Sequence, residues 1–247
     1  MDPIAFSIGN IDIYWYGILV AIAFLLGYLN TLSNVRRYGL DENVVGDLLF
    51  KLAITVIIGA KLGAVVPELG YYIKHPLEIF SRAGLGSHGA IITTMVMGYY
   101  WTKKANLPYW VMADTVAPSI SIGHVFVRLG NYINGELYGT PTSLPWAVEF
   151  PGSYGPVHPA QLYDALASII ILALALWWAR KPKYPGYVFF RVMLLHSIVH
   201  FFIDFIRRHS PLIGPFVLTQ FIAIGFIILT GGLLIRSEIK YRKNRTE

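Results

Sequence analysis

The chain has 247 residues, of which 55% are apolar and 14% charged, and a formal net charge of +6. A soluble domain ordinarily carries about a quarter charged residues, so this composition and a mean hydropathy of +0.54 exclude a water-facing surface and indicate a membrane protein. There is no cysteine, which excludes disulfides, thiolate metal sites and a cysteine nucleophile.

Seven apolar segments are predicted to cross the membrane, because a helix needs about 20 mostly apolar residues to span the hydrocarbon core. In chain order they are 13–32, 47–66, 88–101, 109–128, 160–179, 187–206 and 215–235. The third and fourth are shorter or more polar than the others. The residues before the first segment lack a basic region and a small-residue cleavage site, so we expect no cleaved signal peptide.

The basic residues predict the orientation and argue against a nucleic-acid partner. They lie in short clusters between apolar runs, as the positive-inside rule requires, rather than on one binding face. With the N-terminus outside, the inner loops and tail hold twelve Lys and Arg residues, and the outer side holds five. We therefore expect an extracytoplasmic N-terminus and a cytoplasmic C-terminus.

The outer loop expected over 129–159 is the longest connection, and its five prolines rule out a long helix. Trp146, Val148 and Phe150 give it apolar side chains to bury, which predicts an ordered loop. No internal repeat is evident, so an inverted-repeat transporter gains no support.

Two concentrations of polar residues do not belong in lipid. In the segment 187–206 the polar residues recur at spacings of four, four and three and share one helical arc of roughly 80°; they are His196, His200, Asp204 and Arg207. This stripe is either a hydrogen-bonded ladder between helices or the wall of an active cavity. The second concentration places four polar groups within nine residues: Arg128, Asn131, Asn134 and Glu136. An ordinary polar helix exit would account for Arg128 alone.

Other candidates are weaker by themselves. His88 lies in Gly-Ser-His-Gly-Ala, where a lone histidine is more often structural. Tyr16 fits an interfacial aromatic belt. Lys61 lies inside the pattern Gly59-Ala-Lys-Leu-Gly63, which first predicts close helix packing.

The stretch RLGNYINGELYGTPTSLPWAVEFP (128–151), followed by HPAQLYDAL (158–166), closely resembles the signature of bacterial prolipoprotein diacylglyceryl transferases. Tyr14-Trp15-Tyr16-Gly17 and GSHGA (86–90) resemble two further motifs of that family. The resemblance implies an all-α integral membrane protein, a single domain over 1–247 with seven transmembrane helices, in the bacterial cytoplasmic (inner) membrane.

The resemblance also implies a reaction and its partners. Diacylglyceryl would pass from phosphatidylglycerol, a membrane lipid, to the lipobox cysteine in the signal peptide of a preprolipoprotein, forming a thioether and releasing glycerol phosphate. Neither a metal nor another cofactor is expected. The thiolate is the nucleophile, and arginine's planar fork suits the leaving phosphate.

Residue roles carried over from the family are expectations. Arg128 would grip the phosphate, Asn131 would orient the head group and Glu136 would hold the architecture. Tyr16 and His88 match positions near the lipid head group, with His88 a proton acceptor or a structural residue. Two further motif positions, Asn134 and Gly139, are expected to bind substrate.

The chain departs from the family pattern in the sixth helix. The family typically has Arg, Glu and Arg where His200, Asp204 and Arg207 stand; we still expect these three residues in the catalytic site. Asp204 could keep His200 protonated, or Arg208 or Lys61 could supply the missing charge. Thr140 and Lys61 also replace common arginines, and Ala90 replaces a glycine. These departures leave open an altered lipid preference, slower chemistry or a divergent paralogue.

Two alternatives stay open from the sequence. One is a non-catalytic relative that binds lipid or lipoprotein precursors. The other is a small-solute or proton transporter that uses the stripe of His196, His200 and Asp204. A diacylglyceryl mass increase on a lipobox cysteine would distinguish the transferase from both.

Overall fold

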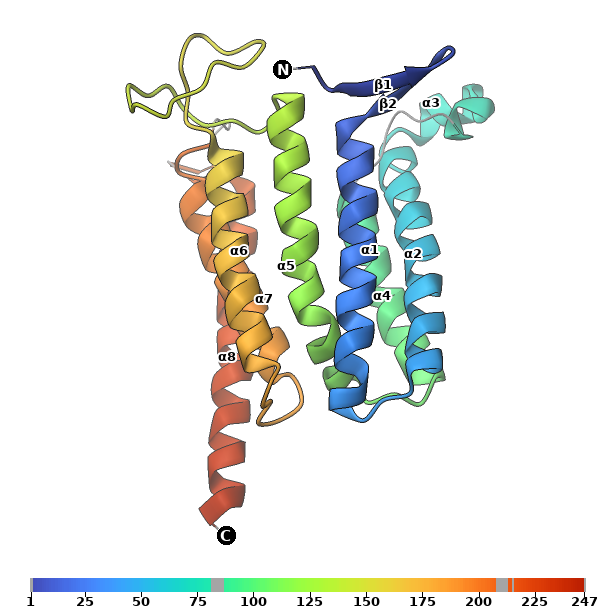
Figure 1. The fold of residues 1–247 in the computed structure, drawn as a ribbon, viewed down its shortest axis with the longest axis vertical. Helices are drawn as coiled ribbons and strands as arrows, with labels where there is room; N and C mark the ends of the chain where they lie inside the picture. The colour runs from blue at the N-terminus through green and yellow to red at the C-terminus, as the bar shows by residue number, and fades with distance from the viewer. Residues whose placement is uncertain (1, 81–86, 208–212, 215, 247) are drawn as a thin grey trace. The chain divides into compact units, whose positions relative to one another are not determined.

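The computed structural model shows a helical protein with one small hairpin (Figure 1), and it describes residues 2–80, 87–207, 213–214 and 216–246. The side chains of Phe80, Ser87 and His88 also lie outside the description. The chain divides into two compact units, residues 1–34 with 113–247 and residues 35–112. The single domain expected over 1–247 stays a prediction.

The larger unit begins with the antiparallel hairpin of β1 (Ile4–Ile8) and β2 (Ile11–Tyr14), which turns at Gly9 in a left-handed conformation (φ +58°). Its helices are α1 (Trp15–Val35), α5 (Tyr109–Asn134), α6 (Ala160–Trp178), α7 (Tyr187–Ile203) and α8 (Leu218–Thr246). Helix α7 packs against both α6 and α8. In Figure 1 the C-terminal part of α8 continues well past the ends of α6 and α7.

Polar contacts fix α1 and α7 onto α5. The hydroxyl of Ser119 on α5 donates to the backbone oxygen of Gly27 (2.8 Å) and accepts from the amide of Asn30 (2.9 Å) on α1. The buried carboxylate of Asp114 accepts backbone N–H groups of Gly186, Val188 and Phe189 at 2.8–2.9 Å. Because the first N–H groups of a helix have no partner within the helix, Asp114 acts as an N-terminal cap for α7 from a neighbouring helix.

The smaller unit contains α2 (Glu42–Val65), α3 (Leu69–Lys74), α4 (Ser87–Lys104) and the 3-10 turns η1 (Arg36–Tyr38) and η2 (Pro76–Phe80). Asp41 caps α2 by accepting the backbone N–H of Asn43 at 2.8 Å. Helices α2 and α4 pack closely: a Cβ added to Gly59 would lie 2.5 Å from the Cβ of Thr93. The predicted close packing at the GxxxG pattern is therefore confirmed.

Every predicted apolar segment falls on a helix, and the protein is a multi-pass membrane protein. Five helices of the described chain are long and apolar enough to cross a bilayer: α1 with η1, α2, α5, α6 and α8. Helix α7 is a shorter apolar helix of 17 residues.

Several helix ends differ from the predicted boundaries, and three of them bear on the site or the tail. Helix α5 continues to Asn134, so the loop starts at 135 rather than at 129. Gly135, in a left-handed conformation (φ +70°), follows the last helical residue. Helix α7 ends at Ile203 rather than at 206. Helix α8 runs to Thr246 because its tail is rich in helix-favouring residues and carries the i,i+4 pair of Glu238 and Arg242, 3.6 Å apart.

The loop over 135–159 is ordered, as predicted, through short backbone pairs such as Val148 with Val157. Phe150 is buried, whereas Trp146 is exposed, contrary to the expectation. The Trp146 indole donates to the hydroxyl of Tyr163 (2.7 Å), so it is held by its polar edge rather than by burial.

Candidate active site

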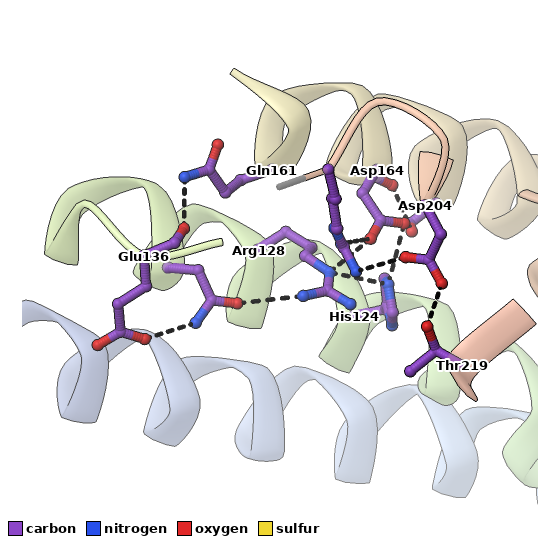
Figure 2. Close-up of polar contacts among 10 residues, drawn as sticks. His124, Arg128, Glu136, Gln161, Asp164, Asp204 and Thr219 are labelled. Carbon is purple, nitrogen blue, oxygen red and sulfur yellow. Dashed lines mark hydrogen bonds and ion pairs between the residues drawn. The ribbon is translucent and has the colours of Figure 1, made fainter. Parts of the chain in front are cut away.

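Asp164, in the second turn of α6, is the centre of the polar cluster in the larger unit (Figure 2). Its side chain is fully buried, and both carboxylate oxygens are engaged. Oδ2 lies 2.6 Å from Nε of Arg128 and 2.7 Å from Nη2 of Arg207. Oδ1 lies 3.1 Å from Nε2 of His124. Three elements thus meet at one carboxylate: α5, α6 and the turn after α7.

The charges of this cluster compensate one another. Arg128 and Arg207 are 8% and 9% exposed, so neither guanidinium is solvated as it would be in water. Burying an unpaired cation is costly, and a counter-ion beside it offsets much of that cost. Asp164 is therefore the group that allows two arginines to lie side by side inside the protein.

Arg128 also begins a chain of hydrogen bonds toward the protein surface, on the opposite side from Asp164 in Figure 2. Its Nη1 donates to Asn131 (3.3 Å), whose amide donates to Oε2 of Glu136 (3.3 Å). The Asn134 amide donates to the other Glu136 oxygen (3.3 Å). Gln161 on α6 donates to the backbone oxygen of Glu136 at 2.5 Å. The four polar groups of the 128–136 segment therefore form one connected network.

Arg207 is held both by the loop and by the end of α7, whose Ile203 oxygen accepts the Arg207 N–H at 3.0 Å. Gly139 pairs with Arg207 in a β-bridge, and the N–H of Thr140 donates to the oxygen of Ile206 (2.7 Å). A Cβ on Gly139 would lie 2.7 Å from the Cβ of His158 and 2.9 Å from the Ile206 oxygen. Only glycine fits this close backbone approach. Arg207 lies in the turn that follows α7 rather than on the helix itself, although its Nη1 lies 3.5 Å from Asp204 of the predicted stripe.

Asp204 connects the cluster to α8. Its Oδ2 accepts the Thr219 hydroxyl at 2.5 Å, and its Oδ1 lies 3.5 Å from Nη1 of Arg207. Figure 2 shows Thr219 pointing at Asp204 from the side away from Asp164.

The histidines of the predicted stripe face α5. His196 shares a hydrogen bond with the hydroxyl of Ser121 (2.9 Å). The ring of His124 lies 5.0 Å from that of His196 and 5.1 Å from that of His200, centroid to centroid. The stripe thus forms part of the contact between two helices and part of the wall around Asp164.

The remaining candidates divide by unit. Tyr16 packs on α5, since a Cβ added to Gly130 would lie 2.7 Å from the Tyr16 ring. Lys61 lies in the smaller unit, with its ammonium 5.9 Å from the ring centre of Tyr72. The side chain of His88 and all of Arg208 lie outside the described residues.

Three ligand atoms of His124, Asp164 and His200 lie within 4.8 Å of one another, close enough to hold a metal ion by distance alone. The electrostatics oppose this use, because two guanidinium groups already occupy Oδ2 of Asp164. A divalent cation would add two more positive charges beside them.

An apolar cavity of about 490 Å³ lies among α1, α5 and α6, with Leu26, Val125 and Leu172 in its lining. Its volume falls within the usual range of small-ligand sites.

The family model described as "Prolipoprotein diacylglyceryl transferase" matches residues 3–236. That range includes every residue of the cluster around Asp164. The chain belongs to the prolipoprotein diacylglyceryl transferase family. The relatives named phosphatidylglycerol–prolipoprotein diacylglyceryl transferase include one from Finegoldia magna, 37% identical over 98% of this chain and 97% of its own, and one from Geobacter sulfurreducens, 34% identical over the same shares. One from Clostridioides difficile is 36% identical over 95% of this chain and 94% of its own.

The sequence interpretation missed the two residues on which the arginines depend. Asp164 lies inside the segment 158–166 that resembles the family signature. An acidic residue in an apolar helix indicates a buried partner or a functional site, and this signal could have identified it. His124 lies four residues before Arg128, so helical periodicity places it on the same face.

Proposed function

We propose that the chain transfers diacylglyceryl from phosphatidylglycerol to the lipobox cysteine of preprolipoproteins, forming a thioether and releasing glycerol phosphate. Family membership over nearly the whole chain supports this reaction. The structural observation that carries the proposal is the pair of buried guanidinium groups, from Arg128 and Arg207, on the single carboxylate of Asp164.

This pair suits a leaving phosphate for a physical reason. A guanidinium has five N–H donors, and among the described residues Arg128 uses Nε on Asp164 and one Nη1 hydrogen on Asn131. The remaining donors can take phosphate oxygens. In a site with little water, such fixed donors stabilise the charge that develops on the leaving group more strongly than water does.

The other residues receive roles from their contacts. One hydrogen-bonded network fixes the orientation of Arg128; it consists of Asn131, Asn134 and Glu136. We propose that the same network orients the lipid head group. Gly139 holds the segment that carries Arg207. Beside Arg207, four further residues complete the proposed site, in substrate binding or in catalysis: Tyr16, His88, His200 and Asp204.

We further propose the membrane arrangement in which all seven main helices cross the cytoplasmic (inner) membrane of a bacterium, with the N-terminus outside. The excess of Lys and Arg on the opposite side supports this orientation. It places the Arg128 end of α5 at the outer surface, where signal peptides emerge. The lipid would enter sideways, with the apolar cavity among α1, α5 and α6 available to an acyl chain.

Mass spectrometry of a lipobox peptide tests this function. The purified protein in vesicles of phosphatidylglycerol is expected to add the mass of diacylglyceryl to the cysteine, and vesicles of phosphatidylethanolamine should support far less. A peptide with serine in place of cysteine is the matched control and should stay unmodified. The absence of any mass increase in every lipid would overturn the proposal and favour a protein that only binds lipid or precursor.

A further inference from the structure

We propose that His124, held by Asp164, takes the proton of the lipobox thiol; this inference rests on the proposed transferase function. A neutral thiol is a poor nucleophile, so the reaction requires a base close to the phosphate site. His124 is a nitrogen base one helical turn from Arg128, on the same face of α5.

The hydrogen bonds of His124 define which nitrogen carries the proton. Its Nε2 lies 3.1 Å from Oδ1 of Asp164 and 3.2 Å from Nε of Arg128. A lone pair on Nε2 would face the lone pairs of the carboxylate, which repel it. The Arg128 N–H has a closer acceptor in Oδ2 of Asp164, at 2.6 Å. Nε2 therefore carries the hydrogen and donates to Asp164, which leaves Nδ1 with the lone pair.

His124 and Asp164 differ in burial, and the difference suits a base that must reach substrate and a carboxylate that only orients it. The Asp164 side chain is fully buried, whereas 20% of the His124 side chain is exposed. A fixed buried carboxylate orients the imidazole and stabilises the imidazolium once the proton arrives. The exposed part of the ring is then available to substrate.

The depth of His124 also suits the substrate. It lies four residues before Arg128, which corresponds to about 6 Å along the helix axis toward the middle of α5. In phosphatidylglycerol the glyceryl carbon under attack lies between the phosphate and the acyl chains. A base one turn deeper than the phosphate-binding guanidinium is therefore level with the reacting carbon.

The step balances as a displacement at carbon. The thiol proton moves to Nδ1 of His124, and the sulfur electron pair forms the S–C bond. The C–O bond to phosphate breaks, and its electron pair leaves on the oxygen of glycerol phosphate. The imidazolium then returns its proton to that phosphate.

Other candidates for the base are less suited by their contacts. Both Glu136 oxygens accept amide hydrogens, from Asn131 and Asn134. His196 is committed to Ser121 through its Nε2. His88, expected from the family pattern, is included in the test because its side chain is not described.

The test compares a lipobox cysteine peptide with the same peptide carrying selenocysteine, because a selenol is already ionised at neutral pH and needs no base. His124→Gln keeps a donor for Asp164 but has no basic nitrogen. With the cysteine peptide we expect kcat to fall about 100-fold or more, with KM nearly unchanged. With the selenocysteine peptide most of the loss should disappear. His124→Asn serves as a second variant, and His75→Asn, an exposed histidine outside the cluster, should match wild type.

Full activity of His124→Gln, an equal loss with both peptides, or selenocysteine rescue in His88→Asn alone would overturn the inference. An inactive wild-type protein with either peptide would overturn the proposed function itself.

Discussion

Replacing Asp164 by asparagine is expected to cause a large loss of stability, because it removes the counter-ion of two buried arginines. The substitution keeps the size of the side chain but removes its charge. The guanidinium groups now 2.6 and 2.7 Å from Oδ2 would then face each other with Asp204, 3.5 Å from Arg207, as the nearest carboxylate. Breaking a buried ion pair by removing one partner costs about 3–5 kcal/mol. At about 2–4 °C per kcal/mol for a chain of this size, Tm should fall by roughly 6–20 °C.

Thermal unfolding of the purified protein in detergent measures this effect, with Asp12→Asn as the control. Asp12 is an exposed carboxylate on the hairpin that accepts a hydrogen bond from Ser7, so its loss should change stability by no more than about 0.5 kcal/mol. Asp164→Glu keeps the charge and should lose less than Asp164→Asn. Equal unfolding temperatures for Asp164→Asn and Asp12→Asn would refute the role of Asp164 as the counter-ion.

Three further substitutions test separate parts of the account. Asp114→Ala removes the acceptor of three backbone N–H groups of α7 and should lower the free energy of unfolding by about 2–4 kcal/mol. The control Asp41→Ala removes the exposed cap of α2 and should cost about 1 kcal/mol. Equal losses in thermal unfolding would contradict the role of Asp114 as a cap for α7. Gly139→Ala places a Cβ 2.7 Å from the Cβ of His158 and should abolish transfer in the peptide assay, while circular dichroism shows that the helices stay folded. Normal activity would show that the β-bridge between Gly139 and Arg207 is dispensable. Gly130→Ala places a Cβ 2.7 Å from the ring of Tyr16 and should lower the rate of transfer. The double variant with Tyr16→Ala should lose no more activity than Tyr16→Ala alone. Additive losses of activity would argue against this contact.

The sequence predicted the helices well because apolar length alone determines where a helix can cross a bilayer. It predicted their ends less well, since the ends depend on partners elsewhere in the chain. Helix α5 continues through Gly130, where the ring of Tyr16 from α1 packs against that glycine. The end of α7 reflects the backbone pairing of Gly139 with Arg207, 68 positions apart, which no local pattern contains.

The same distinction applies to the site. Arg128, Asn131 and Glu136 were found because they are close in sequence and unusual in lipid. Asp164 and His124 were not, because their importance comes from the meeting of α5 and α6 rather than from either helix alone. A charged residue in an apolar helix signals that a partner exists, but only the packing of helices shows which one.

The mass of a lipobox peptide after incubation with folded Arg128→Ala in phosphatidylglycerol vesicles shows whether the Arg128 guanidinium stabilises the leaving phosphate. The control is Arg36→Ala, which removes an exposed arginine paired with Glu42 and should transfer diacylglyceryl at the wild-type rate. Arg128→Ala should lose about 100- to 1,000-fold in kcat, the usual effect of removing one donor to a developing anion. An Arg128→Ala protein that keeps its fold and the wild-type rate would contradict a phosphate-binding role for Arg128.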